Sequence, residues 1–292
     1  MVIPRNKNNT MTLILNDEKI KILEEKAKEI RVSVVEMLAS AGSGHLAGSL
    51  GMADVFSLLY FHVLLHDSKN PAWEERDRLV LSNGHICPVL YTAMAHSGYF
   101  PTEELGSLRK FGSRLQGHPH REFLPMLETS SGPLGEGLSQ AVGMALAFRM
   151  DKKENQLYCL MGDGELDEGQ IWEAAMLAGK EKLGKIIGIV DRNNIQIDGT
   201  TDQVMPLNPL KEKFESFGWH GIEVNGHDFH ALNNSIIEAQ AITDKPSVII
   251  AHTISGKGVP EIEGNYRWHG KAPSMEESQK FIWVLKNSGA SV

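Results

Sequence analysis

The chain has 292 residues, close to the upper limit for one hydrophobic core, so a single large domain is expected. Its 41% of hydrophobic residues and 28 glycines are typical of a globular α/β protein. The formal net charge of −8 argues against a general nucleic-acid surface, so a phosphorylated ligand would need a local positive site.

The chain begins with a polar stretch, and residues 1–16 are expected to form a flexible arm. Its apolar run, Met11 to Leu15, is too short for a signal-peptide core or a membrane span, so we expect a cytoplasmic protein without membrane contact. A long helix is predicted next, capped by Asp17 and ending near Ser40, because apolar residues recur along one face. A glycine-rich segment, residues 42–51, precedes a second apolar helix over residues 52–65.

Strands and helices alternate along the rest of the chain. Strands are predicted over residues 78–81, 157–160, 186–190, 221–224 and 248–253. Helices are predicted over residues 88–97, 135–150, 168–182, 209–217, 228–241 and 275–287, and another opens at residues 102–104. The alternation predicts an α/β fold with a doubly wound, mostly parallel sheet flanked by helices, in one domain over residues 17–292.

Two polar residues follow neighbouring strands of this pattern. Asp163 and Asn193 lie thirty residues apart, each directly after an apolar strand, with a helix between them. Such a β-α-β unit places the two strands parallel and side by side, so both residues should emerge at the carboxyl edge of the sheet. A carboxylate and an amide oxygen next to glycines suit a hard cation that also holds phosphate oxygens. The sequence therefore predicts a Mg²⁺–diphosphate site.

Other motifs have simpler interpretations. Residues 42–47 fit a dinucleotide-binding pattern but follow a helix rather than a strand, and no glycine loop ends in Gly-Lys-Ser/Thr. The acidic segment around Glu165 and Asp167 lacks the EF-hand pattern, so these two residues are interpreted as acids favoured by the dipole of the following helix. Cys87 and Cys159 give no disulfide framework. Cys159 is expected in the core, and Cys87 is expected to be packed, with a pocket-lining position as the alternative.

Four of the twelve histidines stand next to glycine in predicted loops. Glycine gives a ligand close access to the backbone, and histidines gathered at a cleft can donate to hydroxyls or phosphate and transfer protons near neutral pH. They are His45, His85, His118 and His269.

The motifs Gly162-Asp163-Gly164 and Asn193-Asn194 belong to a longer series. The others, in order, are Ser43-Gly44-His45, Leu81-Ser82-Asn83-Gly84-His85, Gln116-Gly117-His118-Pro119, Gly132-Pro133-Leu134-Gly135-Glu136-Gly137, Ile197-Asp198-Gly199 and His269-Gly270. Over roughly residues 20–275, this series resembles the amino-terminal domain of the transketolase family. The resemblance implies the thiamine diphosphate-binding fold, with thiamine diphosphate and Mg²⁺ as cofactors, or Ca²⁺ or Mn²⁺ in place of Mg²⁺.

The resemblance also gives each histidine a role. His45 and His269 would contact the oxygens of the substrate and transfer protons, and His269 would contact the cofactor as well. His118 would lie at the terminal hydroxyl end of the donor ketose, and His85 at the diphosphate of the cofactor.

The metal and the cofactor would be held by neighbouring loops. By the resemblance, the metal ligands are Asp163, Asn193 and the backbone carbonyl of Ile195, and Asn193 would also touch the cofactor.

Gly132 and Pro133 would lie against the cofactor, with Leu134 packed on its aminopyrimidine ring and Gly164 nearby. Glu168 is a candidate for signalling between two cofactor sites across a subunit interface, and a helix-start acid is the alternative.

Three positions depart from the family pattern. Leu46 stands where proline is frequent, Arg192 stands where an acidic residue is common, and Lys271 is inserted before Ala272-Pro273. None of them removes an expected ligand, but together they leave the exact sugar open.

The implied reaction transfers a two-carbon ketol unit from a ketose phosphate to an aldose phosphate, as in the pentose phosphate pathway. In the family, the glutamate that activates the cofactor lies on a second, pyrimidine-binding domain, and nothing after Glu261 resembles such a domain. We therefore expect the amino-terminal subunit of a split transketolase, active with a carboxy-terminal partner chain in an α2β2 heterotetramer. An artificial truncation would have the same sequence.

Two other functions stay open. A related thiamine diphosphate-dependent synthase, acting on dihydroxyacetone or deoxysugar phosphates, would differ in the donor-binding residues of its partner. A cofactor-binding regulatory subunit would show no turnover, and a gene for a second half directly downstream would argue against it.

Overall fold

The computed structural model describes residues 15–287, so the expected arm lies outside the described residues except for its last two positions. Leu15 is buried, and the side chain of Asn16 accepts a hydrogen bond from the Lys19 backbone N–H at 2.8 Å. Asn16, rather than Asp17, therefore caps the first helix, α1 (Asp17–Ala41). Within the described residues, no helix is both long and apolar enough to cross a membrane.

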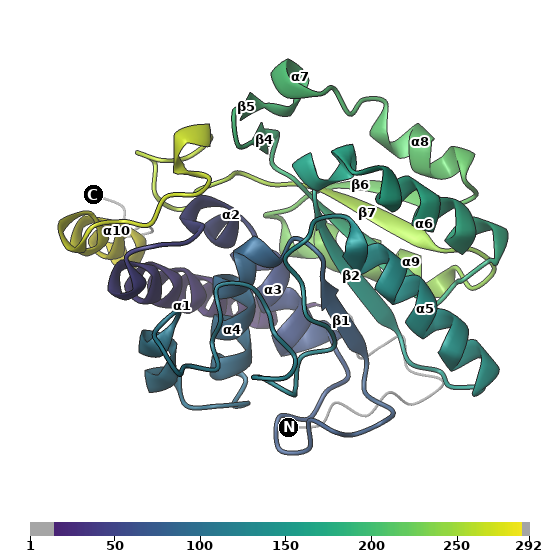
Figure 1. Ribbon diagram of the computed structural model, residues 1–292, viewed down its shortest axis with the longest axis horizontal. Coiled ribbons are helices and arrows are strands. Elements are labelled where there is room, and N and C mark those ends of the chain that lie inside the picture. Colours follow the sequence, from purple (N-terminus) through teal and green to yellow (C-terminus); the bar gives the residue numbers. More distant parts are fainter. Residues whose placement is uncertain (1–14, 288–292) are drawn as a thin grey trace.

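Five parallel strands form the central sheet, in the order β1-β2-β3-β7-β6 (Figure 1). Their bounds are β1 (Arg78–Leu81), β2 (Leu157–Gly162), β3 (Ile186–Arg192), β6 (His220–Asn225) and β7 (Ser247–His252). All five strands were predicted, and the expected α/β class is confirmed.

Helices cover both faces of the sheet because both faces are apolar. In β2, Tyr158 and Leu160 join one core cluster, whereas Leu157, Cys159 and Met161 join the other, since successive side chains point to opposite faces. Figure 1 shows α5 and α6 on one side of the sheet and α1 and α4 on the other.

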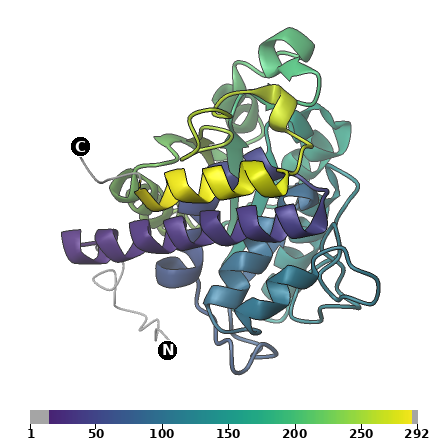
Figure 2. The same cartoon turned by 90° about the vertical axis from the view of Figure 1, so that its left-hand side faces the viewer.

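The first cluster is covered by α1, α2 (Leu46–Gly51), α3 (Ala53–Leu58), α4 (Cys87–His96), α9 (Phe229–Ala241) and α10 (Met275–Asn287). The second is covered by α5 (Glu136–Met150), α6 (Gly169–Lys180) and α8 (Leu210–Ser216). Figure 2 shows α10 lying along α1, and the two helices are in contact.

Short elements account for the differences from the predicted pattern. The predicted helix over residues 52–65 is α-helical only in α3 and continues as a π-helical turn, Leu59–Val63. The segment after residue 101 is a 3-10 helix, Thr102–Ser107. Three elements had no sequence signal: α2 within the glycine-rich segment, the hairpin β4 (Ile195–Gln196) and β5 (Gly199–Thr200), and α7 (Thr201–Val204). Such short elements contain too few residues to show a period.

Candidate active site

The Asp163 and Asn193 loops meet at the carboxyl edge of the sheet, as predicted. Gly162 and Asp191 are aligned in the pairing of β2 with β3, and the next residues form the two turns. Asp163 Oδ2 accepts a hydrogen bond from the Asn194 backbone N–H at 2.6 Å, and its Oδ1 accepts one from Gly164 at 2.8 Å. The two loops are thus joined directly.

Asp163 is a buried acid whose charge needs compensation. Its side chain is 1% exposed, and burial together with the nearby Asp191 carboxylate raises its pKa to about 7. The Arg192 guanidinium lies 3.3 Å from Asp163 Oδ2 and also donates to the Thr201 hydroxyl at 2.8 Å. Arg192, the residue that departs from the family pattern, therefore supplies a positive charge to this carboxylate.

Asn193 is held by bonds on both sides of its amide. Its Oδ1 accepts from the Ile195 backbone N–H at 2.9 Å, and its Nδ2 donates to Asp191 at 2.9 Å. Asp191 also accepts a bond from the Thr253 hydroxyl, and burial raises its pKa to about 6. The bonds orient the amide oxygen and place Ile195, at the start of β4, beside it.

The oxygens of this turn fit a hard cation. In the part of the chain that the structure describes, no three His, Cys, Asp or Glu side chains gather into a metal-binding group. A cation here would instead be held by one carboxylate, an amide oxygen and a backbone carbonyl. Such a set of oxygens suits Mg²⁺, which usually completes its sphere with water and phosphate oxygens.

Three of the predicted histidines form a compact cluster. The ring centroids of His45 and His85 lie 4.8 Å apart, those of His45 and His269 lie 5.3 Å apart, and those of His85 and His269 lie 5.2 Å apart. They come from the N-terminus of α2, the turn after β1 and the loop after β7. Their convergence at one edge confirms the predicted gathering.

His118 lies next to this cluster and is more exposed than the other three histidines. A Cβ added to Gly132 would approach the His118 ring at 3.8 Å, so Gly132 and His118 are neighbours. The pKa values of both His45 and His85 are lowered in part by His118. The four histidines therefore share one electrostatic environment.

Burial keeps the histidine cluster neutral. It lowers the pKa of His45 to about 4, assisted by His269, Arg109 and His118, and it lowers the pKa of His85 well below 6.5. The pKa of His269 is also lowered by burial. Neutral imidazoles at pH 7 offer one donor and one acceptor each, which is suited to hydroxyl groups.

Unpaired polar atoms at this edge leave room for a polar ligand. Within the described residues, His45 Nδ1, Asn83 Oδ1 and Ser131 Oγ are buried without a hydrogen-bond partner. Buried polar atoms in folded proteins are nearly always paired, so these three atoms fit a bound polar group. Asn83 also lies against Gly162 of β2, so the segment that carries His85 lies beside the turn that carries Asp163.

The interpretation of Glu165 as a helix-start acid is wrong. Its side chain is 2% exposed, and it accepts hydrogen bonds from the Ser82 hydroxyl and from the backbone N–H groups of Gly135, at 2.8 Å, and Gly162, at 2.9 Å. Glu165 thus ties together the loop after β1, the start of α5 and the end of β2. Ser82 and Gly135 are far away in sequence, so no local pattern indicated them.

Arg109 is a residue that the sequence analysis did not single out. It has a positive φ of 60°, and its Nη2 donates to the Gly117 carbonyl at 3.3 Å. Its charge contributes to the lowered pKa values of His45 and His118. The Arg109 guanidinium thus adds a positive charge to the surroundings of the histidine cluster.

The remaining predicted site residues lie around this edge. Glu168 is exposed and is the N-cap of α6, but its side chain makes no capping bond. A Cβ at Gly135, which follows Leu134, would meet the Glu168 side chain at 2.8 Å. A Cβ at Gly164 would meet Gln196 at 3.1 Å, so the Gly-Asp-Gly turn packs closely on the β4–β5 hairpin.

Two departures from the family pattern, Leu46 and Lys271, have contacts outside the histidine cluster. Leu46 is fully buried in the core. Lys271 Nζ lies 3.7 Å from the centroid of the Trp268 ring and 2.9 Å from Glu277 Oε1, so it is held against α10.

Both cysteines are free and buried. Burial raises the pKa of Cys87 to about 12, as expected of a packed thiol.

Comparisons with known proteins define the family. Residues 22–283 match the family model described as transketolase, thiamine diphosphate binding domain. The 6-deoxy-6-sulfo-D-fructose transketolase subunit SqwG of Clostridium sp. (strain MSTE9) is 42% identical over 92% of this chain and 98% of that protein. One of the subunits of apulose-4-phosphate transketolase from Phocaeicola vulgatus is 38% identical over 90% of this chain and 93% of that protein.

A solved structure agrees with these relatives. Transketolase from Campylobacter jejuni superposes with a TM-score of 0.85 and 38% identity, covering 92% of this chain and 43% of that one. The fold and the matched model define a thiamine diphosphate-binding domain, and the chain belongs to the transketolase family. It corresponds to the amino-terminal subunit of a split transketolase, which confirms the expected function at that level.

Proposed function

We propose that this site binds thiamine diphosphate with a divalent cation and transfers a two-carbon ketol unit from a ketose phosphate to an aldose phosphate. The observation that carries the proposal is the cluster of three neutral histidines beside the Asp163–Asn193 turn, with His45 Nδ1 buried and unpaired among the described residues. Thiamine diphosphate, when bound, supplies the carbon nucleophile of this chemistry.

The metal and the diphosphate would occupy the turn between β2 and β3. Asp163, Asn193 and the Ile195 carbonyl would hold Mg²⁺, and Ca²⁺ or Mn²⁺ would bind the same oxygens. His85, whose lowered pKa keeps it neutral, would donate one hydrogen bond to the diphosphate. Gly164 would allow the backbone to approach the cofactor closely.

The cofactor ring and the sugar would lie between the histidines and the 132–134 segment. Gly132, Pro133 and Leu134 would form an apolar and backbone surface against the cofactor. His45 and His269 would bind the oxygens of the sugar near the reacting carbons and move protons there. His118, the most open of the four, would bind the terminal hydroxyl end of the donor.

We propose that the partner is a carboxy-terminal transketolase subunit, in an α2β2 heterotetramer. Two relatives carry subunit designations in their names, which supports a second chain. On α6, Met176 and Leu177 are 53% and 42% exposed, and Glu168 is exposed at the start of the same helix. This exposed face suits a protein contact, and Glu168 would lie at it.

The donor and acceptor are proposed to be sugar phosphates, such as those of the pentose phosphate pathway. The names of the two subunit relatives refer to a sulfonated fructose and to apulose 4-phosphate. A related sulfonated or branched sugar is therefore a second candidate.

Product analysis of the complex with its partner tests this function. The chain, mixed with the product of the neighbouring partner gene and given an aldose phosphate as acceptor, should convert a ketose phosphate into an aldose phosphate two carbons shorter and lengthen the acceptor by two carbons. Condensation of dihydroxyacetone or formation of a deoxysugar phosphate would favour the synthase alternative. A complex that binds the cofactor but yields no product would favour a regulatory subunit.

His85→Ala should weaken the binding of thiamine diphosphate by about 10- to 150-fold, because one buried hydrogen bond to a charged group contributes roughly 1.5–3 kcal/mol. Calorimetric titration with Mg²⁺ present measures the effect. The matched control is His96→Ala. His96 lies at the end of α4, and its ring pairs with the Ser33 hydroxyl of α1 at 3.0 Å. Equal affinity of the two variants would remove His85 from the diphosphate site.

A further inference from the structure

The loop over residues 119–131 joins two parts of the site. His118 lies directly before it and Gly132 directly after it. The Ser131 backbone N–H donates to the Pro119 carbonyl at 3.0 Å, which closes the loop at its neck. A Cβ added to Gly84 would clash with Ser131 Oγ and lie 3.2 Å from Pro119 Cδ, so the neck packs on the residue before His85.

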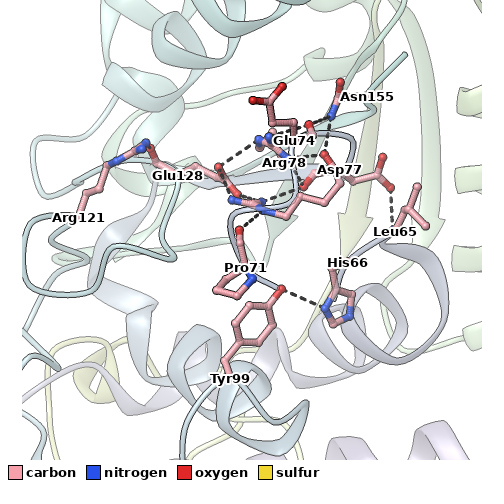
Figure 3. Close-up of polar contacts among 11 residues, drawn as sticks. Leu65, His66, Pro71, Glu74, Asp77, Arg78, Tyr99, Arg121, Glu128 and Asn155 are labelled. Atoms are coloured by element: carbon pink, nitrogen blue, oxygen red, sulfur yellow. Dashed lines mark hydrogen bonds and ion pairs between the residues drawn. The ribbon is translucent and has the colours of Figure 1, made fainter. Parts of the chain in front are cut away.

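A buried ion-pair cluster anchors this loop at Glu128, three residues before Ser131 (Figure 3). The Glu128 side chain is only 9% exposed and pairs with the guanidinium of Arg76 through both carboxylate oxygens, and with Arg78 Nε at 3.5 Å. Arg121 Nη1 donates to the Glu128 backbone carbonyl at 2.6 Å. Side chain and backbone of Glu128 are therefore both held.

The two arginines are themselves fixed to the loop that precedes β1. Arg76 Nε donates to the Pro71 carbonyl at 2.7 Å, and Arg78 Nη2 donates to the Glu74 carbonyl at 2.9 Å. Asp77, between them, accepts bonds from the backbone N–H groups of Leu65 at 2.9 Å and Gln156 at 3.0 Å. The cluster is thus a rigid base at the amino end of β1.

The loop is anchored at both ends of one strand. Arg78 begins β1, and Gly84, under the loop neck, comes six residues later. Glu128 and Ser131 are three residues apart, so the two anchors hold the same arm of the loop. Movement at the Glu128 end would therefore be transmitted along the loop to His118 and to the 132–134 segment.

Apolar packing holds the middle of this loop, where Leu124 and Leu127 are buried in the first core cluster, and the Glu128 ion pairs add a polar anchor. A cavity of about 30 Å³ lies next to the loop and is lined in part by Met126, Leu127, Tyr60 and Tyr99. Buried ion pairs add little net stability because desolvation offsets their attraction, but they impose direction and register. The Glu128 cluster therefore suits a role in positioning better than a role in stability.

We propose that Glu128 is a positioning residue. Through its ion pairs with Arg76 and Arg78 it fixes the position of the 119–131 loop, and with it the positions of His118 and the 132–134 segment. The proposal rests on the proposed function of those residues. Glu128 touches neither substrate nor cofactor, so its effect is indirect.

Tryptic cleavage of the cofactor-free chain tests the anchor independently of activity. Arg121 is exposed and is the only lysine or arginine in the 119–131 loop. Glu128→Gln should raise the rate of cleavage after Arg121 about tenfold, because local opening governs such cleavage. Glu74→Gln is the matched control, since the exposed Glu74 carboxylate pairs with Lys153 at 3.0 Å. Equal cleavage rates in the two variants would overturn the anchor.

Kinetics of the complex test the positioning role. Glu128→Gln should lower kcat/KM for the donor ketose about 10- to 100-fold, since small displacements of positioning groups have effects of this size. In a His118→Ala background the same substitution should have a much smaller effect, because most of the effect of Glu128 is proposed to pass through the position of His118. Glu128→Asp, which keeps the charge, should recover part of the loss and replaces Glu128→Gln if that variant does not fold.

The two failures are distinguishable. Faster cleavage with unchanged donor kinetics, or full additivity with His118→Ala, would overturn the positioning role. If the wild-type complex transfers no ketol unit, the proposed function fails, and the positioning role fails with it. The ratio of the tryptic cleavage rates would still decide whether Glu128 anchors the loop.

Discussion

Asp163→Ala and Asn193→Ala should each abolish magnesium-dependent binding of thiamine diphosphate while the chain stays folded. Asp163 supplies the one carboxylate of the proposed cation site, and Asn193 supplies the oriented amide oxygen. Loss of a metal ligand should weaken affinity by more than the roughly 10- to 100-fold typical of groups that only orient ligands. Calorimetric titration of the cofactor, with Mg²⁺ and then with a chelator, measures the loss.

The fold should survive both changes because the residues lie in turns. Removing Asp163 leaves the Asn194 N–H without its acceptor and the buried Arg192 guanidinium without its carboxylate, which costs about 3–5 kcal/mol of stability. Asp202→Ala, an exposed acid in α7, is the control and should bind the cofactor normally. A folded Asp163 or Asn193 variant with wild-type cofactor affinity would disprove the metal assignment.

His45→Ala and His269→Ala should keep the cofactor and lose turnover by about 10²–10⁴-fold, the usual contribution of an acid–base group. Their ring centroids lie 5.3 Å apart, so both are placed to act on one substrate. The double variant should lose less than the product of the two single losses because contacting residues are not additive. Steady-state kinetics of the complex with its partner, at saturating cofactor, give the comparison.

His230→Ala provides the histidine control, since His230 is exposed on α9. It should leave turnover unchanged. Near-normal kinetics for both His45→Ala and His269→Ala would return these residues to a structural role.

Local pattern was sufficient to predict the main elements of the fold. The strands of the β-α-β unit are continuous apolar runs, and the helix between them has an apolar face, so both periods are visible in the sequence. Their parallel pairing followed from the helix that connects them. The β4–β5 hairpin was missed because each of its strands has only two residues.

The site was predictable where its chemistry follows a strand end or a motif. Asp163, Asn193 and the histidines were proposed in this way, and the structure brings them to one edge of the sheet. Glu165 was misread because its partners Ser82 and Gly135 come from other parts of the chain. Arg109 was missed because a guanidinium in a loop has no local signal, and its effect on His45 depends on tertiary contact.

The most direct test of the account is ketol transfer measured while this chain is titrated with its partner. Thiamine diphosphate, Mg²⁺ and an aldose phosphate acceptor are kept saturating, and the aldose phosphate released from a ketose phosphate is quantified. The account predicts no activity from the purified chain alone and a rise that levels off at one partner per chain. Full transketolase activity from this chain without the partner would contradict the split-enzyme assignment.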